Sequence, residues 1–409
     1  MMGETLFIAH RIPFPPDRGD KIRSHHLLKA LAALGPVHVA TLGETDGDFA
    51  AEPLLAKVAA SHCLARRPAS LGRAGLRALV SGKAVSMTAF DSPDLRAWIA
   101  RTLATRPIET IFVFSGQMWQ YVPASWRGRL VVDLCDVDSA KFEAYATERR
   151  GPRGWIDARE GRLLAAEEAR LAERADATLL ITEAEAALFR SRIGASRANI
   201  VAVGNGIDTA LFDPQAVAPH PALQDECGPH IVFTGQMDYP PNIAAAQRTA
   251  TALMPAIREQ HPAAQLHIVG RAPTAEVRAF DGVNGTRVWG EVPDVRPFLA
   301  AADLVVAPLA IARGVQNKVL EAMAMARPVL LTPEAATGID AVDGRDYAIA
   351  ENDTGLIEHA CALLAGGSTA LAMGASARRF VVDHKCWAAA LAPLEDIVGL
   401  GVPESRNAA

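Results

Sequence analysis

The chain has 409 residues, of which 50% are hydrophobic and 21% are charged, a composition typical of a folded protein. This length exceeds what a single hydrophobic core usually supports, so we expect two domains. The formal net charge of −5 at pH 7 argues against a general nucleic-acid-binding protein. The five cysteines are scattered without a CxxC pair, which argues against a zinc site or a disulfide framework and favours the reducing cytoplasm.

The apolar stretches of the sequence are too short for a signal peptide or for a helix that spans a membrane. The N-terminal residues lack the apolar run of a signal peptide. No run of about 18 apolar residues predicts a membrane-spanning helix. Any membrane contact is therefore expected to be peripheral.

The first half of the chain predicts an alternating series of strands and helices. Strands are expected at residues 5–9, 37–42, 110–114, 130–134, 177–181 and 200–203. Helices are expected at residues 24–35, 141–174 (interrupted near 151–154) and 183–192. A strand, a loop with glycine and proline, a helix and a second strand in succession open a doubly wound α/β domain.

Residues 213–230 are rich in proline and polar side chains, which predicts a connection between two domains. A second alternating series follows this segment. Its expected strands are residues 231–233, 265–269, 286–289, 304–308 and 329–331, and its expected helices are residues 244–260, 295–301 and a final region after residue 356. The sequence thus predicts two α/β halves of similar design.

Residues 53–90 contain no acidic residue. The cations in this stretch are Lys57, Arg66, Arg67, Arg73, Arg77 and Lys83. Such a stretch could dock on an anionic lipid surface, or it could be an ordinary solvated basic face.

The stretch ARGVQNKVLEAMAMARPVL has the pattern of an anion-binding helix start. Gly314 lies in a loop, Gln316, Asn317 and Lys318 open a helix, and Glu321 follows one turn later. Free N–H groups and the positive end of the helix dipole suit an anion. A carboxylate one turn further can accept hydrogen bonds from a diol such as a ribose. The pattern therefore predicts a site for a nucleotide-sugar.

Further stretches occur in order along the chain: RADATLLITEAEAALFR, VGNGIDTALFDP, GEVPDVRPFLAAADLVVAPL and NKVLEAMAMARPVL. This ordered set resembles the motifs of the retaining glycosyltransferases of family 4. The resemblance implies the GT-B fold, in which two Rossmann-like α/β domains face a central cleft. It implies an acceptor-side domain at residues 1–207, a donor domain at 208–384, and a C-terminal helix with Trp387 and a tail at 385–409.

A narrower resemblance rests on FPPDRGDKIRSHHLL, VVDLCDVDSAKFEAYA and FTGQMDYPPN. These stretches are similar to sugar transferases associated with exosortase (PEP-CTERM) and exopolysaccharide systems. The resemblance implies transfer of a sugar from a nucleotide-diphosphate sugar to a glycan or lipid-linked acceptor. It implies no cofactor and no metal, and it suggests action in the cytoplasm or at the inner face of the plasma membrane.

The same resemblance assigns roles in the donor domain. Glu321 is expected to bind the donor ribose, and Lys318 is expected to stabilise the leaving diphosphate. The other expected donor-binding residues are Gly314, Val315, Gln316, Asn317, Arg271, Gly235 and Val292. The chain departs from the family at Arg313, where many relatives have a second glutamate, and this departure leaves the sugar open.

In the first domain, Gly19, Asp20 and Lys21 are expected to form a loop and helix start near the diphosphate and the acceptor. Asp136 is expected to act near the acceptor hydroxyl or the transferred sugar, and Asp138 to cap the following helix. Asp136 and Asp138 form an Asp-x-Asp pair, which binds a metal in the other large glycosyltransferase fold, but the GT-B resemblance implies metal independence.

Two other classes of function stay open. The second domain lacks the cations that most family members carry after its first strand, because Gln236 and Asn242 occupy that segment. Together with Arg313, this loss is compatible with a non-catalytic binding protein of the same fold or, less directly, with a nucleotide-sugar epimerase. The missing phosphate charge could come from Lys318 or Arg271 of the second domain, or from Arg18, Lys21 or Arg23 of the first.

Overall fold

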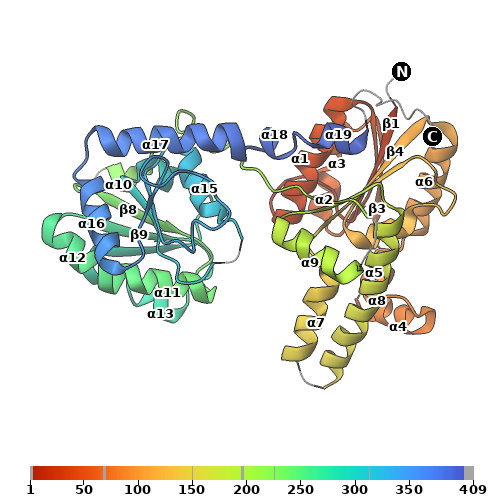
Figure 1. Cartoon of the computed structure of the whole chain (residues 1–409), viewed down its shortest axis with the longest axis horizontal. Coiled ribbons are helices and arrows are strands. Elements are labelled where there is room, and N and C mark those ends of the chain that lie inside the picture. The colour runs from red at the N-terminus through yellow and green to blue at the C-terminus, as the bar shows by residue number, and fades with distance from the viewer. Residues whose placement is uncertain are drawn as a thin grey trace. The chain divides into compact units, whose positions relative to one another are not determined.

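The computed structural model describes residues 3–67, 71–149, 151–194, 198–224, 226–312 and 314–399. The chain forms two compact units (Figure 1). The first unit contains the chain up to Asn205 together with the segment that begins at Ala390, and the second unit contains Gly206–Ala389. The division between the two units therefore falls inside the GNGID segment, between Asn205 and Gly206.

The first unit is built on a seven-stranded parallel sheet in the order β3-β2-β1-β4-β5-β6-β7. Its strands are β1 (Glu4–Ala9), β2 (Val37–Gly43), β3 (Ser61–Arg66), β4 (Ile108–Phe114), β5 (Arg129–Cys135), β6 (Ala177–Leu180) and β7 (Ile200–Ala202). Its helices are α1 (Gly19–Leu34), α2 (Asp46–Ala50), α3 (Glu52–Ala56), α4 (Leu71–Ser81), α5 (Val85–Ala89), α6 (Pro93–Thr105), η1 (Gly116–Tyr121), α7 (Asp138–Glu148), α8 (Pro152–Arg174), α9 (Glu183–Ile193) and α19 (Leu394–Val398). The order of the strands reverses between β1 and β4, as in a doubly wound fold.

The second unit repeats this design with a six-stranded sheet in the order β10-β9-β8-β11-β12-β13. Its strands are β8 (His230–Thr234), β9 (Gln265–Val269), β10 (Thr286–Gly290), β11 (Leu304–Ala307), β12 (Val329–Leu331) and β13 (Ala348–Ile349). Its helices are α10 (Pro221–Gln224), α11 (Pro240–Arg248), η2 (Thr249–Leu253), α12 (Met254–Gln260), α13 (Ala275–Arg278), η3 (Val283–Gly285), α14 (Arg296–Ala301), α15 (Asn317–Ala324), α16 (Asp353–Leu364), α17 (Ser368–Phe380), η4 (Val381–Lys385) and, at the boundary, α18 (Trp387–Ala390). Two Rossmann-like units confirm the predicted GT-B fold class.

Buried apolar strands form the centre of each unit. Strands β1 and β8 are apolar along most of their length, because helices cover both faces of a parallel sheet. The cluster around Phe233 and Leu320 forms the core of the second unit, and the cluster around Ile8 and Val113 forms that of the first. The strands predicted as continuous apolar runs are therefore the central ones.

The C-terminal segment returns to the first unit. Helix α19 packs against α1 and β5, and the Arg129 guanidinium donates a 2.8 Å hydrogen bond to the carbonyl of Ile397. Trp387 is buried, as expected of a packing residue, and it lies against Gly206 in the second unit. A Cβ added at Gly206 would lie 2.4 Å from the Trp387 backbone nitrogen.

Three sequence-based expectations need correction. Helix α1 begins at Gly19 rather than at residue 24, because the amide of Ile22 already donates to the carbonyl of Arg18. Residues 213–230 do not connect the units. They belong to the second unit, where Asp213 pairs with Arg378 at 3.2 Å and the backbone amide of His220 donates a hydrogen bond to the carbonyl of Pro297. The sequence interpretation also missed the edge strands β3 and β13.

Asp133, near the end of β5, is a structural residue. It is 0% exposed and lies 2.8 Å from the guanidinium of Arg23, which is 2% exposed. The same guanidinium donates to the side chain of Asn205 at 2.8 Å and to the carbonyl of Gly204 at 3.2 Å. Arg23 therefore holds α1, β5 and the end of the first unit together, and its charge is neutralised inside the protein.

Within the described residues, no single helix combines the length and the apolar composition needed to cross a membrane. One pair of consecutive segments, Asp353–Leu364 and Ser368–Lys385, meets both criteria jointly but is bent by 102° at the break.

Candidate active site

The carboxyl edge of the second sheet brings two helix starts together. Strands β8 and β11 are neighbours, and the strand order reverses between them. Helix α11 follows β8 and α15 follows β11, and both helices begin at this edge because the strands are parallel. In open α/β sheets, ligands bind at such a reversal of strand order.

Lys318 lies in the first turn of α15 and reaches across this edge. Its Nζ donates a 2.5 Å hydrogen bond to Oδ1 of Asn242 on α11, and it lies 4.9 Å from the ring centroid of Phe233. Burial lowers the pKa of Lys318 to about 8, against the opposing effect of the Glu321 charge. Among the described residues, no carboxylate lies within 4 Å of this ammonium, so its positive charge is not paired.

Glu321 follows Lys318 by one helical turn. Burial raises the pKa of its carboxyl, and the nearby charge of Lys318 partly opposes that rise. Its carboxylate accepts no hydrogen bond from any residue that the structure describes. A half-buried carboxylate costs free energy unless it has partners, so these oxygens are available to hydroxyl donors of a ligand.

The loop before α15 has the expected anion-binding form. Gly314 adopts φ = 65°, a left-handed conformation that favours glycine. Helix α15 begins at Asn317, as predicted. The side chain of the preceding residue, Gln316, donates a 3.1 Å hydrogen bond to the carbonyl of Gly314. No side chain caps this helix start, so its first amides can face an anion. Val315 is exposed beside them, and Arg313 lies outside the described residues.

A chain of neutral groups links Lys318 to a second cation. The side-chain amide of Asn242 donates a 2.9 Å hydrogen bond to the carbonyl of Gln236. The Gln236 side chain in turn accepts a 2.8 Å hydrogen bond from Arg271, which follows β9. Arg271 is exposed and forms no ion pair with a described residue. Two cations are thus held by amides rather than by carboxylates, which leaves their charge for an anionic ligand.

Gly235 is required by the close approach of Lys318. A Cβ at this position would lie 2.9 Å from Nζ of Lys318 and 2.9 Å from Nδ2 of Asn242. Val292, in contrast, is not part of this group of polar residues. It packs against the small apolar cluster of Leu223, Val269 and Phe298.

The Gly235→Ala substitution should weaken binding of a nucleoside diphosphate roughly tenfold. The added methyl group would displace the Lys318 ammonium from its position beside Asn242. Isothermal titration calorimetry would measure the change. Gly282→Ala is the matched control, because Gly282 also has a positive φ and a Cβ there meets nothing within 4 Å. Equal affinity of wild type and Gly235→Ala would contradict the placement of the diphosphate at Lys318.

Asp136 lies at the carboxyl end of β5 in the first unit, where the sequence placed it. Burial raises the pKa of its carboxyl. It lines a narrow pocket with Gln117 and Glu168. Asp138 does not cap α7, because it lies inside the first turn and pairs with Lys141 at 3.4 Å. Carboxylates from α9 and α8 accept the amides at this helix start instead.

Glu168 is a site residue that the sequence interpretation missed. It accepts hydrogen bonds from the amide of Ser139 at 3.0 Å and from its hydroxyl at 2.5 Å. Burial raises its pKa to about 7, although both hydrogen bonds oppose the rise. The sequence shows Glu168 only as one acidic residue among several in an amphipathic helix, and this pattern does not mark it as a site residue.

This raised pKa predicts a pH-dependent stability. The proton on Glu168 stabilises the folded state below the ordinary pKa of 4.5, and this contribution is lost as pH rises toward about 7. The difference in free energy of unfolding between wild type and Glu168→Gln should therefore change by roughly 1–3 kcal/mol between pH 5 and pH 8, in favour of the variant at high pH. Urea denaturation measures it, with the exposed Glu173→Gln on the same helix as control. A pH-independent difference would contradict the protonation of Glu168.

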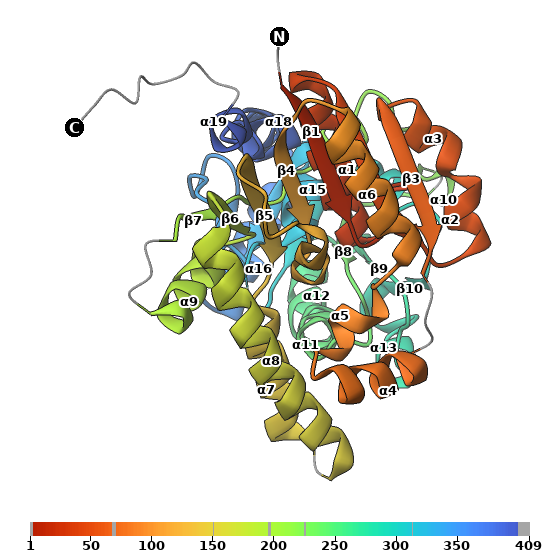
Figure 2. The same ribbon diagram turned by 90° about the vertical axis from the view of Figure 1, so that its right-hand side faces the viewer.

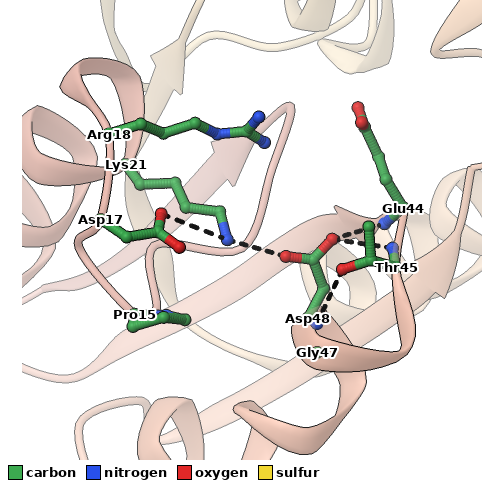
Figure 3. Close-up of a pocket in the computed structure, with 8 residues that line it drawn as sticks. All are labelled: Pro15, Asp17, Arg18, Lys21, Glu44, Thr45, Gly47 and Asp48. Carbon is green, nitrogen blue, oxygen red and sulfur yellow. Dashed lines mark hydrogen bonds and ion pairs between the residues drawn. The ribbon is translucent and has the colours of Figure 1, made fainter. Parts of the chain in front are cut away.

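The predicted loop at Gly19 takes part in an open pocket of about 410 Å³ (Figure 3). Lys21 crosses from α1 to Asp48, where Nζ lies 2.7 Å from Oδ1, and the Lys21 side chain is 4% exposed. Arg18 is 48% exposed and extends beside Lys21 (Figure 3). Asp48 therefore neutralises Lys21, and Arg18, which pairs with Asp20 at 3.3 Å, is the more exposed of the two cations.

Gly19 and Asp20 lie in the first turn of α1, at the predicted helix start, and Asp20 is paired with residues at the end of β1. Burial alone would raise the pKa of Asp20, but hydrogen bonds from His10 and Arg11 outweigh it and hold that pKa below its ordinary value. Asp20 thus orders the strand-end residues rather than facing a ligand. A Cβ at Gly19 would meet nothing within 4 Å, so packing within the protein does not require glycine there.

His10 is a second residue that the sequence interpretation did not single out. It follows β1 at the point where the strand order reverses, and it is 5% exposed. Its Nε2 lies 3.2 Å from Asp20, and its ring stacks near Phe114. A polar residue directly after a buried strand was the available signal.

Two family models match consecutive parts of the chain. Residues 19–206 match the glycosyl transferase 4-like domain, and residues 228–366 match the glycosyl transferases group 1 domain. No curated protein sequence matches the chain.

Several solved structures share the fold over nearly the whole chain. Sucrose-phosphate synthase from Thermosynechococcus elongatus is 15% identical with a TM-score of 0.60, and the alignment covers 97% of this chain and 98% of that one. Anabaena HepE in complex with UDP-glucose is 14% identical with a TM-score of 0.59, over 97% and 99% of the chains. TarM is 10% identical with a TM-score of 0.61, over 98% and 99%. Consecutive glycosyl transferase 4-like and group 1 domains on this architecture identify the chain as a glycosyltransferase of the GT-B fold.

Proposed function

We propose that the chain transfers a sugar from a nucleotide-diphosphate sugar to a glycan or lipid-linked acceptor, with retention of configuration. One observation carries the donor assignment. On α15, an ammonium and a carboxylate lie one turn apart, and among the residues that the structure describes the first has no ionic partner within 4 Å and the second accepts no hydrogen bond. A ligand with an anionic group and a neighbouring diol satisfies both side chains at once.

Each group then has a role in the reaction. The bond between the anomeric carbon and the diphosphate oxygen breaks, and a bond to the acceptor oxygen forms on the same face. The acceptor proton passes to the departing diphosphate. Lys318, Arg271 and the first amides of α15 stabilise the negative charge that develops on that diphosphate. Glu321 holds the ribose. In this proposal the two cations serve in place of a resident metal.

The only indication of the nucleotide base and of the transferred sugar comes from the ligands of structurally similar proteins. HepE structures contain UDP and UDP-glucose, which supports a nucleoside diphosphate donor for this chain. The acceptor side is proposed for the first unit, at Asp136 and at the polar pocket that contains Arg18. We propose that the product contributes to exopolysaccharide or other cell-surface polysaccharide, made at the cytoplasmic side of the membrane.

The test uses the purified full chain and a panel of radiolabelled nucleotide-diphosphate sugars, with and without lipid and glycan acceptors. Release of the nucleoside diphosphate with transfer, or slow hydrolysis without an acceptor, supports the proposal. Conversion of the donor to an isomer without release of nucleotide would identify an epimerase. Binding without turnover would identify a binding protein, and absence of both binding and turnover for every donor would refute the donor assignment.

A further inference from the structure

Helix α4 turns small residues toward the protein and large aliphatic residues toward solvent, the opposite of most surface helices. Its inward side is formed by Ala74 and Ala78, which are both 0% exposed. Its outward side carries Leu76, Leu79 and Val80, with exposed fractions of 67%, 58% and 85%. A surface helix normally turns its large apolar residues toward the core and its polar residues toward water. The large aliphatic side chains of α4 therefore face outward without a partner among the described residues.

The charges around this apolar face are mostly positive. Arg73, Arg77 and Lys83 are exposed, and α4 itself contains no acidic residue. One half-buried acid, Asp91, lines the edge of this surface and pairs with Arg77 at 3.5 Å, which leaves Arg73 and Lys83 as its exposed cations without a described ionic partner. An open pocket of about 430 Å³ is lined by both classes of side chain, including Leu76, Val80, Arg77 and Lys83. An apolar surface rimmed by cations suits the boundary between lipid headgroups and acyl chains.

Helix α8 extends this surface and fixes α4 in place. Figures 1 and 2 both show α4 beside α8. The Arg159 guanidinium donates to the carbonyls of Ala78 at 2.9 Å and Lys83 at 3.1 Å. One turn earlier on the same side of α8, Trp155 is 58% exposed and Ile156 is 48% exposed.

The nearby acid on α8 does not oppose an anionic partner. Glu160 is buried, and its carboxylate accepts hydrogen bonds from the amides of Val85 at 2.7 Å and Ser86 at 2.8 Å. It therefore joins α8 to α5, directly after α4, without adding negative charge to the outer surface. The orientation of α4 is rigidly specified by the protein, so its outward apolar face is a property of the fold.

We propose that α4 and the first turns of α8 form a membrane-docking surface that inserts Leu76, Leu79, Val80 and Trp155 at the surface of an anionic bilayer. The bilayer is favoured over a protein partner because the exposed cations surround the aliphatic side chains on a single helix, the pattern of an interfacial helix. Part of the basic stretch is excluded from this surface, because Arg66 pairs with Asp46 and Arg67 with Glu44. The surface uses no residue of the donor site, so it is independent of the proposed reaction.

Vesicle sedimentation with the full chain tests this proposal. Wild type should bind vesicles that contain phosphatidylglycerol, with affinity that falls as salt rises, and should bind pure phosphatidylcholine weakly. Leu76→Gln with Val80→Gln should reduce the affinity for anionic vesicles roughly tenfold or more. Leu371→Gln on α17 is the matched control, because Leu371 is 78% exposed on a helix of the second unit. Binding of a nucleoside diphosphate should be unchanged in all variants.

Three results would overturn the membrane assignment. The first is that wild type fails to sediment with anionic vesicles, and the second is that the double variant sediments as well as wild type. The third is that wild type is a dimer by light scattering and the double variant a monomer, which would show that a second copy covers α4. Trp155 fluorescence is a direct readout, although the other five tryptophans of the chain require Trp155→Phe as a reference. A proposed donor site that proved wrong would leave all of these outcomes interpretable.

Discussion

Replacing Lys318 with methionine should weaken binding of a nucleoside diphosphate roughly 100-fold, with little effect on binding of the corresponding nucleoside. The ammonium is the half-buried cation at the start of α15, and its only described hydrogen bond goes to the neutral Asn242. Methionine keeps the length of the side chain and removes the charge. Titration calorimetry with nucleoside, monophosphate and diphosphate separates the contribution of each phosphate. Transfer rates should fall in parallel with diphosphate affinity.

The lowered pKa of Lys318 adds a pH signature to this prediction. The ammonium is fully protonated well below a pKa of about 8 and loses its charge as pH rises through that value. Diphosphate affinity should therefore decrease between pH 7 and pH 9 in the wild type. In Lys318→Arg the affinity should be independent of pH across this range, because a guanidinium stays protonated. Identical pH profiles for the two proteins would show that Lys318 does not contact the diphosphate.

Replacing Glu321 with alanine should lower kcat/KM for the donor roughly 100-fold, because two hydrogen bonds from the ribose hydroxyls to a half-buried carboxylate are lost. The substitution should not reduce thermal stability, since no described residue donates a hydrogen bond to this carboxylate and burial raises its pKa. The exposed Glu358→Ala on α16 is the control for a general effect of charge.

A nucleotide that lacks the ribose diol makes this test specific. Wild type should bind a nucleoside diphosphate more tightly than its 2′,3′-dideoxy analogue, and Glu321→Ala should bind the two equally. If the variant still preferred the ribose form by the wild-type factor, Glu321 would not be the ribose ligand. A crystal structure with bound nucleotide would then show which group replaces it.

The start of α15 could be predicted from the sequence because its determinants are local. Gly314 supplies the left-handed turn, and the period of an α-helix places Lys318 and Glu321 one turn apart on any helix that starts at Asn317. The central strands were also predictable, because long apolar runs in a parallel sheet are buried on both faces. Edge strands such as β3 are half-exposed and lack that signal.

The pairing of charges could not be predicted from the sequence. Lys21 and Lys318 are both lysines in the first turn of a helix that follows a buried strand. Asp48 neutralises the first, whereas the second meets only the neutral Asn242 on another helix. Each partner is far away in the chain and is brought close by the winding of the sheet.

The two α/β halves, the central strands and the spacing of Lys318 and Glu321 could be predicted from the sequence, since they depend on periodicity and on local backbone preference. Which cation keeps its charge available for a ligand, and which side of α4 carries the exposed leucines, became clear only from the folded structure. Both depend on side-chain partners from distant segments, and the free energy of a buried or exposed group is set by those partners rather than by its own neighbours in the chain.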